Sequence, residues 1–291
     1  FLTAIELGIF RALGADRLNA EELAGRAGAD PRALELLLNA LVSMSLLEKT
    51  DGRFGNVPFI MEEIASNGGE AFEAFRHAAH LWERWSELTK IVCGSGSPVS
   101  PAYLARAGAL TMRQYASGSA RALAEGVGGP NVYRLLDIGG GPGTFALALA
   151  KRWPQLHAVV FDANAQALDM AREDIAARGL GERIATCRGD FLKDDLGSGY
   201  DLVLLSCVIS LGGEEEDRRL LARVRDALAP GGTIVIRDAI LDPSATAPPQ
   251  FALFSINMLV TTPKGRAYTY TEISRWLAAV GFVSMRRLPL Q

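Results

Sequence analysis

One segment constrains the fold of this chain more than any other: residues 135–143 are Leu-Leu-Asp-Ile-Gly-Gly-Gly-Pro-Gly. The apolar start predicts a buried β-strand, and a helical pattern, Thr144–Lys151, comes directly after the glycines. Glycine is needed where the backbone turns sharply and lies close to a ligand, because a Cβ would occupy that space. The helix offers free amide hydrogens and the positive end of its dipole. The segment therefore predicts a strand, a ligand-binding turn and a helix in succession.

The spacing of the glycines separates this turn from the usual dinucleotide-binding pattern. Gly139, Gly141 and Gly143 form GxGxG, with Asp137 two residues ahead, whereas dinucleotide folds usually show GxGxxG. A glycine turn alone is weak evidence, so its interpretation depends on the residue types at the ends of the later strands.

Short apolar runs alternate with helical patterns from Tyr133 onward. This alternation is typical of a parallel sheet with helices on both faces, an α/β fold of the Rossmann-like kind. The runs are Arg134–Ile138, Ala158–Phe161, Ile184–Cys187, Asp201–Cys207 and Thr233–Ile236.

Acidic residues come after the second and third of these runs. Asp162 is placed to accept hydrogen bonds from ribose hydroxyls. Asp190 offers an acceptor for an exocyclic amine, and Phe191 offers a ring on which a base can stack. The glycine turn and these residues, at the ends of successive strands, together predict a site for a nucleoside with a charged tail. Each aspartate can also simply end its strand, and Phe191 can be plain core packing.

The first 60 residues read as short helices followed by a small hairpin, the pattern of a winged helix. Asn19 and Asp30 are placed as N-caps, since their side chains can accept amide hydrogens in the first turn of a helix. The expected elements are helices over Thr3–Leu13, Ala20–Ala27 and a segment that starts at Pro31, and strands over Leu46–Lys49 and Arg53–Val57.

A winged helix can bind DNA, but the charge of this one argues against it. Residues 1–60 hold six Arg or Lys and eight Asp or Glu, a net charge of −2. A duplex binder needs a surplus of cations to displace phosphate counterions. We therefore expect a role in pairing and no nucleic-acid partner; a ligand-sensing DNA regulator remains the alternative from another class.

Length and composition favour two globular domains. The chain has 291 residues, is 49% hydrophobic and 22% charged, and carries a net charge of −3. Residues 61–125 look helical, and the cluster Gly126–Pro130 predicts a boundary between a first domain, residues 1–125, and a second, residues 126–291. The chain opens at Phe1 without a Met, which indicates that the native N-terminus has been lost.

Two further features bear on where the protein works. No apolar stretch reaches the length of a membrane span, so no membrane partner is expected. The three cysteines, Cys93, Cys187 and Cys207, form no CxxC pair, which predicts free thiols in a reducing compartment and a cytoplasmic location. We expect no metal site.

With these motifs in place, the chain resembles the S-adenosylmethionine-dependent small-molecule O-methyltransferases of the caffeate, hydroxyindole and antibiotic-tailoring type. The segments that carry the resemblance are Glu6–Phe10, Glu21–Ala24, the wing, the glycine turn, Gly189–Phe191, Leu228–Gly232 and Gly281-Phe282. The resemblance implies a winged-helix dimerisation domain and a seven-stranded, mostly parallel methyltransferase sheet with an antiparallel last strand. It also implies a homodimer whose N-terminal helices help to close the partner's pocket.

The resemblance also assigns expected roles to individual residues. In the donor site, Gly139 and Gly141 border S-adenosylmethionine, with Asp137 beside them, Asp162 holds the ribose, Asp190 and Phe191 hold adenine, and Ser206 lies near the amino-acid tail. The expected pocket for a small, aromatic or polyketide-like acceptor comprises Trp82, Met112, Tyr115, Asn257 and Met258. Met258 is equally suited to the core.

The chain departs from the family at the catalytic base. Relatives have a histidine just after the fourth strand, where this chain has Ser210. A serine hydroxyl cannot remove a proton near neutral pH without a second base. Methylation at oxygen remains the main hypothesis. S-, N- or C-methylation of an acceptor that is already a good nucleophile is an alternative, with orientation supplying most of the acceleration.

A different residue can also act as the base. His77 and His80 are three residues apart on a predicted helix and share a face, and Tyr268 is a weaker candidate. Asp238 and Asp242, near the fifth strand, can orient a group or simply end that strand. Finally, the same donor site can serve non-methylating chemistry.

Overall fold

A computed structural model describes residues 1–67, 70–96, 106–127 and 132–288. Contacts divide the chain into two compact units, Phe1–Glu83 and Arg84–Gln291. This division differs from the boundary that Gly126–Pro130 predicts, because the helix that precedes this cluster, α8 (Arg106–Gly126), packs into the core of the second unit. The buried residues of α8 in that core include Ala116, Ala120 and Leu123.

The first unit has one core, built from its short helices and its hairpin. Its elements are α1 (Leu2–Glu6), α2 (Ile9–Leu13), α3 (Ala20–Ala27), α4 (Pro31–Ser43), β1 (Leu47–Thr50), β2 (Arg53–Asn56), α5 (Pro58–Asn67) and most of α6 (Glu70–Ser86). The predicted helix over Thr3–Leu13 is two helices, because Gly8 adopts a left-handed conformation with a φ of 65°. Both predicted caps are confirmed: the side chains of Asn19 and Asp30 accept hydrogen bonds from backbone amides of α3 and α4.

The second unit is built on a five-stranded sheet in which every pair of strands is parallel. The order is β5-β4-β3-β6-β7. The bounds are β3 (Arg134–Ile138), β4 (His157–Asp162), β5 (Ile184–Arg188), β6 (Tyr200–Ser206) and β7 (Leu228–Arg237). The five predicted apolar runs are thus confirmed as strands. The fifth begins earlier than predicted because Leu228 already pairs with Tyr200 of β6, ahead of a register shift after which pairing resumes at Thr233.

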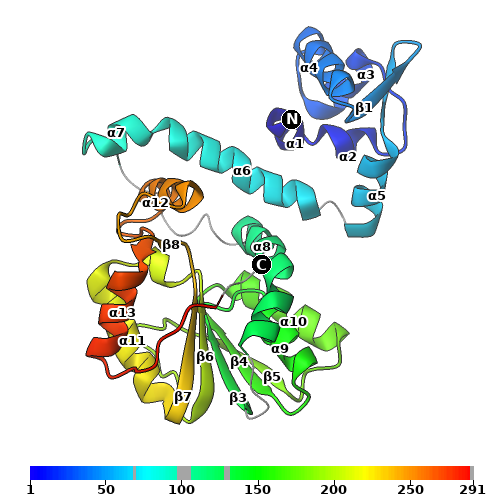
Figure 1. Ribbon diagram of the computed structural model, residues 1–291. Helices are drawn as coiled ribbons and strands as arrows, with labels where there is room; N and C mark the ends of the chain where they lie inside the picture. The colour runs from blue at the N-terminus through cyan, green and yellow to red at the C-terminus, as the bar shows by residue number, and fades with distance from the viewer. Residues whose placement is uncertain (68–69, 97–105, 128–131, 289–291) are drawn as a thin grey trace. The chain divides into compact units, whose positions relative to one another are not determined.

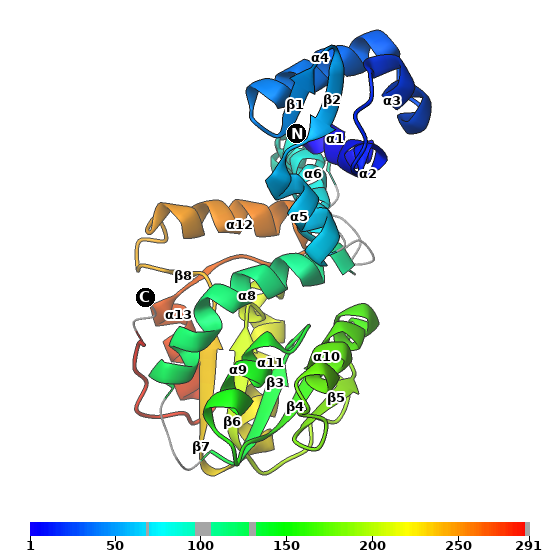
Figure 2. The ribbon, with the colours of Figure 1, turned by 90° about the vertical axis from the view of Figure 1, so that its right-hand side faces the viewer.

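Helices cover both faces of this sheet (Figure 1). The first face packs against α8, α9 (Thr144–Arg152) and α10 (Ala165–Ala177), and Figure 2 looks onto this side. The second face packs against α11 (Glu214–Ala227) and α13 (Tyr270–Ala279). Successive side chains of a strand point to opposite faces, so Leu204 belongs to the first core and Leu205 to the second.

The remaining elements of the second unit lie before the sheet or after β6 in the chain. They are α7 (Leu88–Val92), a 3₁₀ turn (Ile209–Leu211), β8 (Ile240–Leu241), α12 (Pro249–Thr261) and β9 (Tyr268–Thr269). β8 and β9 pair in parallel with each other as a separate two-stranded sheet.

The predicted α/β class with a mainly parallel sheet is confirmed. In the part of the chain that the structure describes, the central sheet has five strands, and the antiparallel last strand that the resemblance implies is not among them. The described residues after Gly281 form no strand. Among the described helices, none is both long enough and apolar enough to cross a membrane.

The buried amide of Asn56 offers a test of how the first unit is held together. Its Nδ2 donates to the carbonyl oxygens of Phe10 and Gly14 at 2.8 and 2.9 Å, at the end of α2. Asn56→Ala leaves these carbonyls without that donor, so we expect the free energy of unfolding to fall by about 2 kcal/mol. Denaturant unfolding measures this change. Asn39→Ala, at an exposed position of α4, is the control and should change it by less than about 0.5 kcal/mol; equal effects of the two changes would contradict the prediction.

Candidate active site

Four residues line up across the carboxyl edge of the central sheet. Ile138 is paired with Phe161 on one side and with Leu205 on the other. The residues one step further, Gly139, Asp162 and Ser206, are therefore neighbours, and Ser206 is itself paired with Arg237. We call Asp162, Gly139, Ser206 and Arg237 the carboxyl-edge row. Binding sites in open α/β sheets form at this edge.

The strand alternation turns this row toward the first face of the sheet. Val160, Leu204 and Val235, two residues before the last members of their strands, are all buried in the core against α8 and α9. Residues two apart in a strand point to the same side. The side chains of Asp162, Ser206 and Arg237 therefore emerge on the side of α9, the helix that comes after the glycine turn.

Two glycines of the turn are required for different reasons. A Cβ on Gly139 would lie 2.6 Å from Cγ2 of Val208, so packing alone excludes a side chain there. Gly141 has a φ of 53°, and the nearest atom to its Cβ position is Oδ2 of Asp162, at 3.9 Å. Gly141 therefore combines a left-handed backbone with open space, which is what the close approach of a ligand requires.

Asp162 is fixed against the turn by backbone amides. Its Oδ2 accepts from the amide of Gly141 and its Oδ1 from the amide of Asn164, both at 2.8 Å. Burial raises the pKa of this carboxyl, while these amides hold it down. Each carboxylate oxygen can accept a further hydrogen bond, so Asp162 can receive two vicinal hydroxyls of a ribose.

Asp137 lies beneath the glycine turn and is fully buried. A Cβ on Gly140 would lie 2.8 Å from the Cγ of Asp137, so the carboxyl is packed directly under the backbone of the turn. Burial raises the pKa of Asp137 to about 7. The structure thus places this expected donor-site residue as a support of the turn.

Asp190 and Phe191 come after β5, as the sequence predicts. The carboxylate of Asp190 accepts from Lys193 Nζ at 2.8 Å and from the amide of Leu192 at 2.9 Å. The Lys193 ammonium lowers the pKa of Asp190, with help from the Leu192 amide. Phe191 is partly buried and packs against the core under the second face of the sheet.

Ser210 lies just after β6, beside a second carboxylate. It is 1% exposed, and its backbone amide donates to Oδ2 of Asp238 at 3.2 Å. Asp238 comes directly after β7, and burial raises the pKa of its carboxyl. Asp242 differs: its carboxylate caps an exposed turn through Ser244, whose hydroxyl lowers its pKa. Of these two aspartates, Asp238 is the one that bonds to Ser210.

A third carboxylate, Asp217, lies in the first turn of α11 and close to Gly212. It is 3% exposed, and burial raises its pKa to about 7, with the charge of Asp238 adding to the shift. Sequence reasoning does not single out Asp217. Its position in the acidic run 214–217 reads as the first turn of a surface helix, so no sequence signal separates it from its exposed neighbours.

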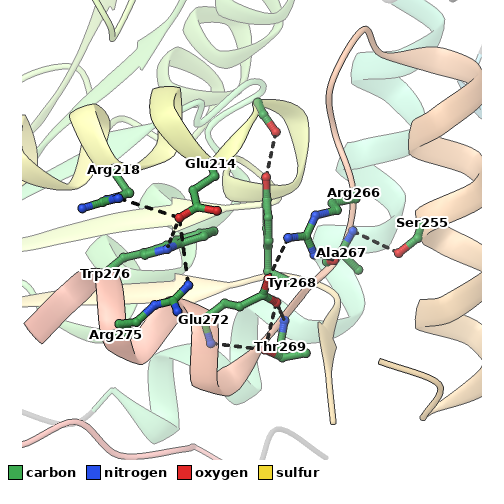
Figure 3. Close-up of polar contacts among 11 residues, drawn as sticks. Glu214, Arg218, Ser255, Arg266, Ala267, Tyr268, Thr269, Glu272, Arg275 and Trp276 are labelled. Carbon is green, nitrogen blue, oxygen red and sulfur yellow. Dashed lines mark hydrogen bonds and ion pairs between the residues drawn. The ribbon is translucent and has the colours of Figure 1, made fainter. Parts of the chain in front are cut away.

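Tyr268 is held by a polar network around β9, drawn in Figure 3. Its hydroxyl donates to the carbonyl oxygen of Gly212 at 3.2 Å, and Arg266 lies 4.0 Å from its ring centroid. Burial opposes ionisation and raises the pKa of Tyr268, so its hydroxyl stays protonated near neutral pH and cannot serve as a base. Although burial opposes it, hydrogen bonds from Arg266 and Thr269 lower the pKa of Glu272 to about 2. These bonds hold the segment from Arg266 to Thr269 against Gly212 and the start of α13.

The predicted acceptor-pocket residues fall into both units. In the second, Asn257 Oδ1 accepts from Trp85 Nε1 at 3.2 Å, Met258 is 7% exposed, and Met112 lies exposed on α8. Tyr115 also belongs to α8, but its side chain lies outside the described residues. In the first, Trp82 is 74% exposed on α6. The burial of Met258 favours a core role, and the pocket roles of the others stay predictions.

The two histidine candidates both belong to α6 in the first unit. His80 Nδ1 lies 3.3 Å from Oε2 of Glu83. The side chain of His77 lies outside the described residues. Their role as a base therefore stays a prediction. Within the described ranges, no group of three His, Cys, Asp or Glu side chains is arranged to hold a metal ion.

The edge of the sheet thus offers an open glycine turn, a carboxylate that can receive ribose hydroxyls, and polar groups toward β7. A nucleoside with a charged tail fits these residues. Together with the order of strands and helices, they define the class: the protein is an S-adenosylmethionine-dependent methyltransferase.

Comparison with known proteins then gives the family. Residues 122–283 match the O-methyltransferase domain model, and residues 1–59 match the O-methyltransferase dimerisation domain model. The chain is 34% identical to 3-hydroxy-5-methyl-1-naphthoate 3-O-methyltransferase of Streptomyces sahachiroi over 97% of its own length and 85% of the relative's. The chain belongs to the O-methyltransferase family.

Two further relatives show the range of the similarity. N,N-dimethyltransferase OxyT of Streptomyces rimosus is 33% identical over 84% of this chain and 75% of its own. The structure of human N-acetylserotonin methyltransferase in complex with SAM is 24% identical, with a TM-score of 0.76 over 98% of this chain and 88% of that one, and supports the fold.

The buried carboxyl of Asp217 predicts a pH-dependent stability. Its folded-state pKa, about 7, lies above the unfolded value of about 4, so the folded state binds more protons between these values and stability falls as pH rises from about 4 to about 7. Asp217→Asn removes this loss. We expect the variant to unfold like the wild type near pH 4 and to be more stable at pH 8, by up to about 4 kcal/mol.

Denaturant unfolding at several pH values measures this difference. Asp226→Asn, at an exposed position of the same helix, is the matched control and should leave the pH dependence unchanged. An Asp217→Asn variant whose stability matches the wild-type curve at every pH would show that this carboxyl does not titrate as described.

Proposed function

We propose that this protein transfers the methyl group of S-adenosylmethionine to a hydroxyl of a small aromatic or polyketide-like acceptor, with S-adenosyl-L-homocysteine as the by-product. The proposal rests on the pairing of the open turn at Gly141 with the Asp162 carboxylate on the carboxyl edge of the sheet. The similarity to a naphthoate O-methyltransferase supports an aromatic acceptor.

In this proposal, the donor lies along the first face of the sheet edge. Asp162 accepts hydrogen bonds from the ribose hydroxyls, and Gly139 and Gly141 let the backbone approach the donor. Asp190 remains the expected acceptor for the adenine amine, with one oxygen of its carboxylate shared with Lys193. Phe191 is the expected stacking surface, and Ser206 is the expected neighbour of the amino-acid tail.

For an oxygen acceptor, the proton must leave to a group near Ser210. Tyr268 cannot accept this proton, because its raised pKa keeps the hydroxyl protonated near neutral pH and the hydroxyl donates to the Gly212 carbonyl oxygen. Asp238 contacts the amide of Ser210 and has a raised pKa caused by burial, so its basicity is greater than that of an ordinary aspartate. We assign Asp238 as the proton acceptor, directly or through a water held by Ser210.

A second candidate is a nitrogen acceptor, which the replacement of the family histidine by Ser210 favours. An uncharged amine has a lone pair ready to attack and needs no base before transfer. One relative, OxyT, is named as an N,N-dimethyltransferase. In this case the residues at the site would act mainly by orienting the acceptor.

The first unit supports a proposal about assembly. Residues 1–59 match a dimerisation domain, so we propose a homodimer formed through the first unit. The three cysteines without a CxxC pair are consistent with a reducing, cytoplasmic location. The net charge of −2 over residues 1–60 disfavours nucleic acid as a partner.

The activity is tested by incubating the purified protein with methyl-labelled S-adenosylmethionine and a panel of hydroxynaphthoates, anthracyclic phenols and the matching aromatic amines. We expect labelled product from a phenol together with stoichiometric S-adenosyl-L-homocysteine, measured by mass spectrometry. Asp162→Ala is the control and should weaken donor binding by about tenfold or more. Labelled product from amines alone would support the second candidate. Failure of wild-type protein to bind the donor in calorimetry would contradict the proposal.

The role of Asp238 predicts a specific pH profile. Asp238→Asn keeps an oxygen acceptor for the Ser210 amide but removes the base, so kcat should fall by about 10²-fold. The wild-type rate should rise with pH through the raised pKa of this carboxyl, and the variant should lack that rise. Asp242→Asn is the matched control, since its carboxylate caps an exposed turn. An Asp238→Asn enzyme with the wild-type profile would exclude this residue as the base.

A further inference from the structure

Arg237 occupies the end of the carboxyl-edge row opposite Asp162. It is the last residue of β7 and is paired with Ser206, which neighbours Gly139 in the row. Adjacent strands lie about 4.8 Å apart, so the three strand intervals from Asp162 to Arg237 span roughly 14 Å. A carboxylate thus marks one end of the row and a guanidinium the other, with the glycine turn between them.

The guanidinium of Arg237 is half-buried without an anionic partner. Its Nη1 lies 3.4 Å from both the Ser206 Oγ and the Cys207 Sγ, and its Cζ lies 5.3 Å from the ring centroid of Phe145 in the first turn of α9. Over the described ranges, the hydrogen-bond partners of this guanidinium are Ser206 and Cys207, and no ion pair with an Asp or Glu oxygen is formed.

The next residue in the chain, Asp238, does not form an ion pair with the Arg237 guanidinium. The oxygens of Asp238 accept instead from the backbone amides of Ser210 and Ala239, at 3.2 and 2.8 Å. Removing a charge from water without a close counter-charge costs free energy. A half-buried arginine that is held by a cation–π contact with Phe145 and by two weak hydrogen bonds is therefore well suited to receive an anion from outside the chain.

The two ends of the row define which anion fits. Asp162 repels an anion and accepts hydroxyl hydrogens, whereas Arg237 attracts a carboxylate and can bind it through two parallel hydrogen bonds. A ligand that presents hydroxyls at one end and a carboxylate at the other matches this polarity. We propose that Arg237 binds the α-carboxylate of the amino-acid part of S-adenosylmethionine, with the Ser206 hydroxyl as a second donor. This inference rests on the proposed function, because it assumes that the donor lies along the row.

The alternative is that Arg237 only stabilises the fold, through its cation–π contact with Phe145 and its charge near Asp238. Two ligands separate these two roles. S-adenosyl-L-homocysteine carries the amino-acid tail, and 5′-methylthioadenosine is a thioether nucleoside without that tail. A residue that binds the carboxylate affects only the first ligand, whereas a residue that shapes the site affects both.

The experiment measures the Kd of both ligands by calorimetry for wild-type protein and for Arg237→Met, which keeps an unbranched stem for packing. A charge-assisted hydrogen-bond pair is expected to contribute about 10- to 100-fold in affinity. We expect that loss for S-adenosyl-L-homocysteine and a change of less than about twofold for 5′-methylthioadenosine. Arg237→Lys keeps the charge but not the paired hydrogen bonds and should recover part of the loss.

Arg134→Met is the matched control. Arg134 is the first residue of β3, so it lies at the amino end of the strands, away from the carboxyl-edge row. Its Cζ lies 5.1 Å from the ring centroid of Tyr200, so it shares the residue type and the ring contact of Arg237 but not the site. We expect no change for either ligand. If Arg237→Met does not fold, wild-type protein still tests the inference, because it must bind S-adenosyl-L-homocysteine at least about tenfold more tightly than the analogue without the tail.

The outcomes are distinct. Equal losses for both ligands, or unchanged affinity for S-adenosyl-L-homocysteine in the Arg237→Met variant, would overturn the role of Arg237. So would a wild-type protein that does not discriminate against the analogue without the tail. In each of these cases the wild type still binds nucleosides, and the proposed function stands. A wild-type protein that binds neither ligand would instead refute the proposed function itself.

Discussion

The parallel register of four strands is the constraint on which the rest of the site depends. Asp162, Gly139, Ser206 and Arg237 come from four separate segments of the chain, and they meet only because their strands are paired at these positions. A slip of one residue would turn a side chain to the opposite face of the sheet. The buried apolar residues two positions earlier in three of these strands fix that register, since they must face α8 and α9.

The alternation of side chains along β7 also separates donor binding from the proposed proton transfer at the carboxyl edge of the sheet. Arg237 is directed to the first face, where the open turn offers room for a donor, while Asp238 bonds to Ser210 beside the core of the second face. Burial then makes Asp238 and Asp217 stronger bases than exposed aspartates. Ser210, just after β6, thus has a buried carboxyl of raised pKa, Asp238, bonded to its backbone amide.

The turn itself shows how fold and binding share the same residues. Gly139 must lack a side chain because Val208 occupies the space, and Gly141 has a left-handed backbone and donates its amide hydrogen to Asp162. Asp137, packed beneath Gly140, supports the turn from below. Packing therefore requires a glycine at position 139, whereas the left-handed backbone favours one at position 141.

Local periodicity and residue types with strong conformational preferences were enough to predict the winged-helix pattern, the five strands, the glycine turn and the acidic residues that come after the strands. They were not enough to predict that α8 joins the second unit, that Gly8 divides the first helix, or that Met258 is buried, since packing between distant segments settles these features. Arg237 and Asp217 look like ordinary surface charges in the sequence. Only the folded chain gives them a special environment. Asp217 is buried and Arg237 is half-buried without a close counter-charge because separate strands and helices pack around them.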